Sequence, residues 1–282
     1  MRMNFENCYD FSNDELSREL EKLYNMYTAD TRPVSAPTAH LLGGQSGSGK
    51  STIHQIVTDK EPNTIIIDGD RFREHHPRFN EIQQIYGNDA VNYTQPFANA
   101  IANALIERFS NEHYNLIIEG TCRTFSVPLK SCEQLKAKGY TVNLAVMCTD
   151  KEVAWKSTID RYNEMKARGL TPRAVPRDKY DQTVKALPGN ISKLYNSRKF
   201  DDILLFNRNR ECLYRFTETP DRDPGEIVAK ELGGEVFSTS TQSDGKIKPV
   251  SQQIAEAKEK SLKNKATNHS STPKPPKGKS WK

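Results

Sequence analysis

The chain has 282 residues, enough for one large α/β domain with a substantial core, and its five scattered cysteines indicate neither a disulfide framework nor a zinc site. The hydrophobic fraction is 35%, no apolar run is long enough to span a membrane, and the first ten residues lack a signal-peptide pattern, so we expect a cytoplasmic protein. The net charge of +5 belongs to the C-terminal tail, because residues 241–282 hold ten Lys against three acidic residues and the rest of the chain carries −2.

The first predicted element is an amphipathic helix over residues 11–27. Ser12 and Glu15 have the spacing of a capping box, and apolar residues recur at helical intervals from Leu16 to Tyr24. We expect this helix to pack against a sheet, and a surface for a regulatory partner is the alternative.

A glycine-rich loop follows a predicted short strand at 38–42 and precedes a predicted helix that starts near Ser51. It matches the pattern G-x-x-x-x-G-K-[ST], in which glycines let backbone N–H groups converge on a polyphosphate. We expect Lys50 to reach the β and γ phosphates of ATP and the Ser51 hydroxyl to bind Mg²⁺. The expected nucleotide-binding residues are Gly44, Gln45, Ser46, Gly47, Ser48, Gly49, Lys50, Ser51 and Thr52.

Two carboxylates follow the next predicted strand, which covers 64–67. Asp68 and Asp70 would lie at the carboxyl edge of a parallel sheet, where α/β proteins bind their ligands. We interpret Asp70 as the general base for a substrate hydroxyl, with Asp68 as second choice and helix capping as the alternative role. The adjacent His75 and His76 have no third ligand at metal spacing, so we interpret them as surface or hydrogen-bonding residues.

A helix is predicted where Phe97, Ile101, Leu105 and Phe109 repeat at intervals of four. Gln95, Asn99 and Asn103 repeat at the same interval on another face. These amides suit either solvent or hydrogen bonding to a sugar-like substrate, and we include Asn99 and Asn103 among the candidate substrate-binding residues.

Another buried strand is predicted at 116–118, and a polar cluster follows it. Glu119 would lie near a metal-bound water or serve a structural role, while Thr121 and Arg123 would face the same crevice and bind substrate.

The following segment is predicted to contain a helix at 129–138, a strand at 141–148 and a second helix that starts with a capping box at Thr149. The second helix would direct three apolar side chains toward the core, namely Trp155, Ile159 and Tyr162. It also carries Arg161, and the basic loop at 166–176 carries Arg173. Together these arginines resemble the lid of a small-molecule kinase, which neutralises the phosphoryl group during transfer.

Two last strands are predicted at 203–206 and 212–216, with a turn at 207–210 that could approach an adenine ring, and a closing helix is predicted at 223–232. From about Ser238 the composition becomes rich in Ser, Thr, Gln, Lys and Pro. We therefore expect a kinase domain at 1–237 and a Lys-rich, disordered or partly helical tail at 238–282. The tail lacks interleaved aromatic residues, so we expect only non-specific contact with nucleic acid.

Five blocks in order, GGQSGSGKS, IIIDGD, NLIIEGTCR, IDRY and PRAVP, resemble the zeta toxin family of bacterial toxin–antitoxin systems from about residue 38 to residue 232. The resemblance implies a P-loop kinase-like parallel sheet with helices on both faces. It also implies transfer of phosphate from ATP to the 3'-hydroxyl of UDP-N-acetylglucosamine, which stops peptidoglycan synthesis. A cognate antitoxin would neutralise such a protein by covering the nucleotide site.

By the same resemblance, Lys50 and Ser51 match the family's phosphate and Mg²⁺ contacts, and Asp70 matches its base. Thr121 matches a substrate-side residue, while Arg161 and Arg173 match the paired arginines that hold the phosphate. The chain departs from the family at Asn103, where an acidic residue is common, and an amide can hydrogen-bond a sugar hydroxyl but cannot act as a carboxylate.

Other functions remain compatible with the residues. The same machinery could phosphorylate another small hydroxyl acceptor, such as an antibiotic or a nucleoside. A nucleotide-switched ATPase that holds nucleic acid through its basic tail is a second alternative, and a vestigial loop that binds ATP without turnover is a third.

Overall fold

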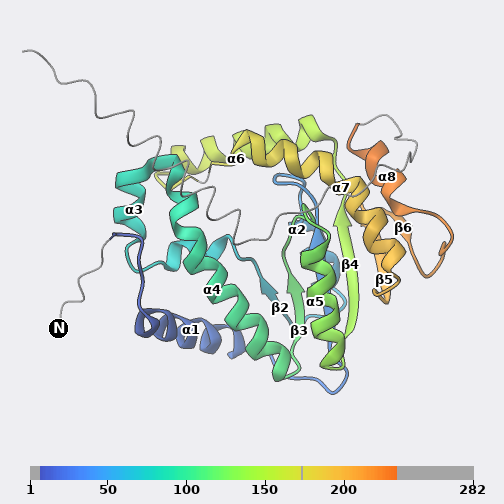
Figure 1. Ribbon diagram of the computed structural model, residues 1–282, viewed down its shortest axis with the longest axis horizontal. Coiled ribbons are helices and arrows are strands. Elements are labelled where there is room, and N and C mark those ends of the chain that lie inside the picture. Colours follow the sequence, from blue (N-terminus) through green and yellow to red (C-terminus); the bar gives the residue numbers. More distant parts are fainter. Residues whose placement is uncertain (1–6, 173, 234–282) are drawn as a thin grey trace, which may run out of the picture. The chain divides into compact units, whose positions relative to one another are not determined.

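The computed structural model describes residues 7–172 and 174–233 (Figure 1). Helices and strands alternate along most of this part of the chain, which confirms the predicted α/β class. The elements in chain order are α1 (Asn13–Thr28), β1 (Thr38–Gly43), α2 (Ser51–Thr58), β2 (Thr64–Ile67), the 3₁₀ helix η1 (Arg71–His75), α3 (Phe79–Tyr86), the 3₁₀ helix η2 (Gly87–Asp89), α4 (Ala90–Asn111), β3 (Asn115–Ile118), α5 (Ser126–Ala137), β4 (Thr141–Met147), α6 (Lys151–Ala167), α7 (Arg177–Ser197), β5 (Asp202–Phe206), β6 (Cys212–Arg215) and α8 (Pro224–Glu231).

The six strands form one sheet in the order β2-β3-β1-β4-β5-β6 (Figure 1). Strands β1 to β5 run parallel, and β6 returns antiparallel to β5 as an edge hairpin. The chain leaves β1 toward β2 and later returns to β4 on the opposite side of β1. The carboxyl end of β1 is therefore the point where ligands bind in open α/β sheets.

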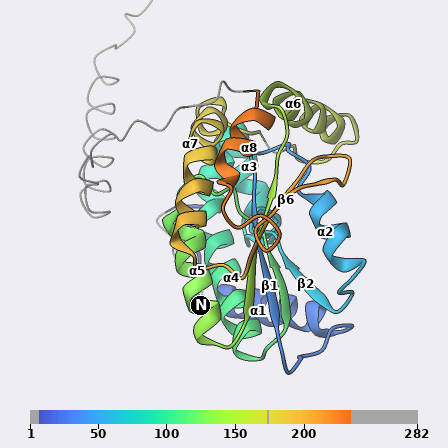
Figure 2. The same cartoon turned by 90° about the vertical axis from the view of Figure 1, so that its right-hand side faces the viewer.

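Both faces of the sheet are covered, as expected for parallel strands with continuous apolar runs (Figure 2). On one face, Ile53 and Val57 of α2 pack against Leu42 and Ile117 of the central strands. The larger core cluster lies on the other face and includes buried residues of α1, α4, α5, α7 and α8. The structure therefore confirms helices on both faces.

Two helices differ from the sequence predictions. Helix α7, with Pro188 inside it, was not predicted. Helix α6 exists where expected, but Ile159 is 43% exposed rather than directed into the core. The buried residues of α6 are the small Ala154 and Thr158, because this helix lies across the carboxyl edge of the sheet rather than on its face.

At the start of the described chain, the predicted capping box is present at the first turn of α1. Ser12 accepts from the Glu15 amide, and the Glu15 carboxylate accepts from the Ser12 amide at 2.8 Å. His76 is buried rather than exposed and contacts the Tyr9 carbonyl at 3.2 Å, so of its two predicted roles the hydrogen-bonding one holds. The predicted tail, 238–282, lies outside the described residues, and its boundary stays a prediction.

No helix within residues 7–172 and 174–233 combines the length and the apolar character that crossing a membrane requires.

Candidate active site

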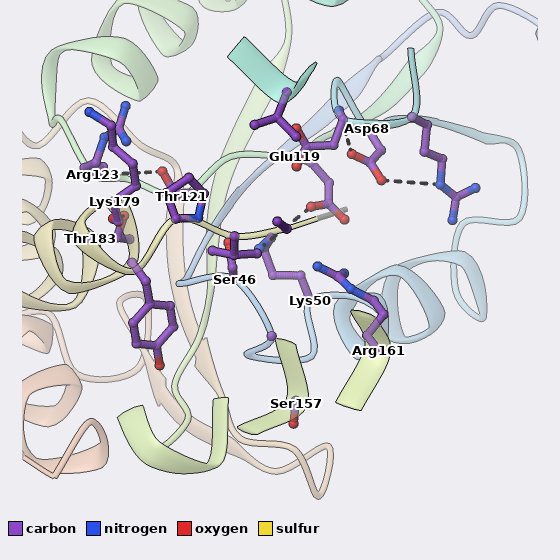
Figure 3. Close-up of a pocket in the computed structure, with 18 of the residues that line it drawn as sticks. Ser46, Lys50, Asp68, Glu119, Thr121, Arg123, Ser157, Arg161, Lys179 and Thr183 are labelled. Atoms are coloured by element: carbon purple, nitrogen blue, oxygen red, sulfur yellow. Dashed lines mark hydrogen bonds and ion pairs between the residues drawn. The ribbon is translucent and has the colours of Figure 1, made fainter. Parts of the chain in front are cut away.

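A cavity of about 760 Å³ opens at the carboxyl edge of the parallel strands (Figure 3). The glycine-rich loop, the segments that follow β2 and β3, and helices α4, α6 and α7 all contribute to its walls. The chemistry-bearing lining residues are Ser46, Lys50, Ser51, His54, Asp68, Asp70, Arg71, Arg73, Asn92, Gln95, Glu119, Thr121, Arg123, Ser157, Arg161, Lys179, Tyr180, Thr183 and Arg208. Elements that are distant in sequence therefore meet at the loop.

The glycine-rich loop has the backbone that its sequence predicts. Gly44, Gly47 and Gly49 have φ values of +130°, +72° and +94°, which side chains with a Cβ rarely adopt. At Gly47 a Cβ would also overlap the Ala154 carbonyl oxygen and lie 2.8 Å from Thr158 Cγ2. Helix α6 is thus seated directly on the loop.

Side-chain hydrogen bonds fasten the loop to its surroundings. The buried Gln45 amide donates to the Thr149 carbonyl at 2.7 Å, and the Thr149 hydroxyl donates to the Ser48 carbonyl at 2.7 Å. From the β5–β6 turn, Arg208 donates to the carbonyls of Ser48, at 3.1 Å, and Gly47, and to the Ser157 hydroxyl of α6 at 2.9 Å. These contacts make the loop and the first half of α6 one rigid support.

Lys50 lies at the centre of the cavity and points toward Glu119 (Figure 3). Its Nζ donates to the Gly44 carbonyl at 3.3 Å and lies 3.9 Å from a Glu119 carboxylate oxygen. Glu119 also lies 2.8 Å from His54 Nε2. Burial opposes ionisation of Glu119, but His54 and Lys50 outweigh it and lower the pKa of this carboxyl. The Glu119 carboxylate therefore supplies a negative charge beside the phosphate-binding Lys50.

Both carboxylates that follow β2 line the cavity. The register of β2 on β3 pairs Ile67 with Ile118, so Asp68 and Glu119 continue side by side beyond the strand ends. Asp68 accepts from the Asp70 amide at 3.1 Å and pairs with Arg71 at 3.3 Å. The Asp70 side chain is 65% exposed and is held by Arg73 through two hydrogen bonds of 3.1 Å.

The segment after β3 presents Thr121 and Arg123 to the cavity. Between them Cys122 has a φ of +52°, a conformation that favours glycine, and its thiol is buried against β1. Asn190 of α7 donates to the carbonyls of Cys122, at 2.9 Å, and Arg123, at 2.7 Å. Helix α7 therefore supports the segment that carries both candidate substrate-binding residues.

The two predicted lid arginines have different outcomes. Arg161 lies on helix α6, where the sequence analysis placed it, and lines the cavity near Lys50 (Figure 3). Arg173 lies outside the described residues, although its neighbours at 174–176 line the cavity. The role of Arg173 stays a prediction.

On helix α4 the structure selects other amides than the sequence did. Asn92 and Gln95 line the cavity, whereas Asn99 and Asn103 do not. Asn99 instead accepts a hydrogen bond of 2.6 Å from Gln95. Of the three amides that repeat at intervals of four, only Gln95 therefore lines the cavity.

Several cavity residues were not predicted as site residues. Lys179 and Thr183 belong to α7, whose apolar residues at 187, 191 and 194 repeat at helical intervals and could have identified it. Arg73 lies three residues after Asp70, a spacing that brings side chains together in a helical turn. His54 lies on the second turn of α2, and nothing in its sequence context distinguishes it.

The lining residues fit a magnesium ion bound together with a nucleotide. Mg²⁺ prefers oxygen ligands and is usually held by one or two protein groups together with substrate phosphates. The Ser51 hydroxyl and the carboxylates of Asp68, Asp70 and Glu119 all line this cavity. Within the described ranges, no cluster of three or more His, Cys, Asp or Glu could hold a metal on its own.

Comparisons with known proteins point to one family. The family model described as Zeta toxin matches residues 24–219. A Toxin zeta from Streptococcus agalactiae is 38% identical over 238 residues, covering 84% of this chain and 83% of that protein. Toxin PezT from Streptococcus pneumoniae serotype 4 is 41% identical over 230 residues, covering 80% of this chain and 90% of that protein. A solved structure from the PezAT chromosomal toxin–antitoxin system of Streptococcus pneumoniae is similar at a TM-score of 0.72 and 34% identity, covering 93% of this chain and all of that chain.

Proposed function

The chain belongs to the zeta toxin family, and on that premise we propose that it is a kinase that transfers the γ-phosphate of ATP to the 3'-hydroxyl of UDP-N-acetylglucosamine. One observation carries the proposal. A single cavity brings together a phosphate-binding loop, a carboxylate that follows β2 and an arginine on α6, at the carboxyl edge of a parallel sheet. Donor, base and charge-neutralising group can act there on one transferred phosphoryl group.

In the proposed mechanism the loop amides and Lys50 hold the β and γ phosphates of ATP. Asp70 orients the acceptor hydroxyl and accepts its proton while the hydroxyl oxygen attacks the γ-phosphorus. The bond between the γ-phosphorus and the β–γ bridging oxygen breaks, and ADP leaves. Arg161, together with Arg173, neutralises the charge on the transferred group.

A magnesium ion, when bound, would neutralise charge on the donor phosphates. We propose that Ser51 holds it, with Asp68 and Glu119 as nearby oxygen groups that bind it or its water ligands. The lowered pKa of Glu119 keeps this carboxylate ionised in the neutral range, as such a role requires.

The charge balance of the cavity favours an anionic acceptor. Among its described lining residues, seven are Lys or Arg and three are Asp or Glu, which leaves a surplus of four positive charges. ATP carries about four negative charges, of which a bound Mg²⁺ would offset two, and the diphosphate of a nucleoside diphosphate sugar adds about two more, so donor, metal and acceptor together would balance this surplus. An uncharged nucleoside would leave part of it uncompensated, and a cationic antibiotic would be repelled.

Positive side chains also lie where an extended acceptor would reach. Arg123, from the segment after β3, and Lys179 and Thr183, from α7, line the cavity, and Figure 3 draws them away from Arg161. Neither Arg123 nor Lys179 has an acidic partner among the described residues. We propose that the part of the cavity wall that these residues and Thr121 form receives the acceptor.

We further propose that the protein acts in the cytoplasm, where it stops peptidoglycan synthesis until a cognate antitoxin covers its nucleotide site. Relatives named Toxin PezT and a structure from the PezAT toxin–antitoxin system support this role.

An acceptor screen with radiolabelled ATP tests the proposal. Purified protein is incubated with Mg²⁺, labelled ATP and, separately, UDP-N-acetylglucosamine, free N-acetylglucosamine, a nucleoside and an aminoglycoside. We expect label on UDP-N-acetylglucosamine and much less on the sugar that lacks the diphosphate. Label on the antibiotic or nucleoside alone would reject the proposed acceptor.

A further inference from the structure

A buried arginine that the proposed mechanism does not use lies directly behind Asp70. Arg73 belongs to the 3₁₀ helix η1 and is only 8% exposed. Arginine is almost never buried unless it is paired, because removing its charge from water is costly. The groups that pair with Arg73 therefore indicate its role.

One side of the Arg73 guanidinium holds Asp70. Nε and Nη2 each donate to Asp70 Oδ1 at 3.1 Å. No hydrogen bond from a described residue reaches the second oxygen, Oδ2, so that oxygen can accept from an acceptor hydroxyl. The 3₁₀ geometry of η1 contributes, because side chains at i and i+3 lie above one another in such a helix.

The other side of the guanidinium is fixed to helix α4. Nη1 donates to the Val91 carbonyl and contacts Thr94 Oγ1 at 3.4 Å, while Nη2 donates to Gln95 Oε1. Gln95 in turn donates to Asn99 at 2.6 Å. Arg73 therefore links the carboxylate after β2 to a long helix that is anchored in the core.

Without this link Asp70 would have little to orient it. Its side chain is 65% exposed, and an exposed carboxylate samples several rotamers and is hydrated. Two charge-assisted hydrogen bonds to the same oxygen restrict it to one orientation. Since Lys is a point charge without the planar fork of Arg, only Arg can make both bonds while also contacting α4.

We infer that Arg73 is a positioning residue for phosphoryl transfer, which acts by holding Asp70 Oδ1 so that Oδ2 faces the acceptor hydroxyl. This inference rests on the proposed function, in which Asp70 is the base. A merely structural role, joining η1 to α4, would predict lower stability but no specific dependence of turnover on Asp70.

A double-mutant cycle separates these roles. We compare Arg73→Lys, Asp70→Asn and the double variant by kcat for transfer to UDP-N-acetylglucosamine, or to the acceptor that the screen identifies. Arg73→Lys should lower kcat by about 10- to 100-fold, with the KM for ATP nearly unchanged, because misplacing a catalytic group by about 1 Å costs this much. In the Asp70→Asn background the same change should lower kcat less than twofold, since the group that it positions no longer acts.

Arg78→Lys is the matched control. Arg78 is also largely buried and paired with a carboxylate, Glu15 at 3.2 Å, but it does not line the cavity. Arg78→Lys should destabilise the fold in thermal unfolding without lowering kcat. Equal losses of kcat in Arg73→Lys and Arg78→Lys, or the same loss from Arg73→Lys in both backgrounds, would overturn the inference.

A second variant serves if Arg73→Lys fails to fold. Gln95→Leu removes the side-chain oxygen that accepts a hydrogen bond from Arg73 Nη2, while the guanidinium itself is kept. It should lower kcat by a few-fold in the wild-type background and not in Asp70→Asn, and equal effects in both would again overturn the inference. If Asp70→Asn keeps the wild-type kcat, the proposed base and this inference both fail. If Asp70→Asn lowers kcat but the effects of the two substitutions on kcat simply add, the inference alone fails.

Discussion

Because α6 packs directly against the phosphate-binding loop at Gly47, the effect of Gly47→Ala on stability can be predicted quantitatively. The new Cβ meets two separate costs at this position. The left-handed backbone, with φ of +72°, costs a residue with a Cβ about 1–2 kcal/mol. Overlap with the Ala154 carbonyl and with Thr158 Cγ2 at 2.8 Å forces α6 or the loop to move, which costs about 1–3 kcal/mol more.

Gly49→Ala is the matched control, because it carries the first cost without the second. Gly49 also has a positive φ, of +94°, but its nearest neighbours are Arg208 atoms at 3.6 Å, an ordinary contact. We therefore expect a loss of about 1–2 kcal/mol in Gly49→Ala and about 2–5 kcal/mol in Gly47→Ala. Gly69, whose φ is not positive and whose nearest neighbour lies at 3.8 Å, should tolerate Ala almost without loss.

Urea unfolding of the three purified variants measures these differences as the free energy of unfolding, from the midpoint and slope of each transition. Isothermal titration with ATP should also show weaker binding in Gly47→Ala, because the loop amides are displaced. Equal destabilisation of Gly47→Ala and Gly49→Ala would refute the reasoning, since α6 would then not press on the loop.

Four further predictions follow from the same structure. Lys50→Ala should abolish ATP binding and transfer together in a calorimetric titration and the acceptor assay, and normal turnover would reject the site. The pKa of Glu119 is lowered in the fold, so its ionised form stabilises the protein above the pH at which an unfolded glutamate ionises, and this stability is lost as the pH falls through the lower, folded value. Glu119→Gln should therefore flatten the acid side of a plot of unfolding free energy against pH, and an unchanged slope would contradict the pairing. Burial raises the pKa of Cys122 to about 12, so iodoacetamide at pH 8 should modify the exposed Cys212 in the native protein and Cys122 only after unfolding, as peptide mapping can show. A chain that ends at residue 237 should keep its transfer activity, whereas an ATPase that depends on nucleic acid would lose its stimulation with the tail.

The parts of the site that are local in sequence were predictable. The strand, loop and helix around Lys50 follow one another directly, and each has a strong signal of its own. Asp70 and Thr121 were predictable for a related reason, because the carboxyl ends of parallel strands meet at one edge. The zeta toxin resemblance pointed to the same fold, and the structure and the comparisons confirm it.

The parts that depend on how helices rotate and dock were not predictable. Asn99 and Gln95 share one helix face, but only the packing of α4 decides that the cavity ends at Gln95. Ile159 follows an apolar pattern, yet α6 crosses the strand ends and buries the small Ala154 instead. Helix α7 keeps a helical apolar spacing at 187, 191 and 194 despite Pro188, but nothing in that pattern shows that Lys179 and Thr183 line the cavity.

The support that Asn190 gives to the carbonyls of Cys122 and Arg123 has a consequence for the timing of synthesis. A growing chain that has emerged from the ribosome only as far as α6 already contains the whole donor loop and Asp70. It still lacks α7, and with it Lys179, Thr183 and the amide that secures the segment after β3. Because a domain folds as a unit, the wall that carries Lys179 is completed only after α7 has been synthesised, and a chain that ends at α6 cannot yet enclose an acceptor.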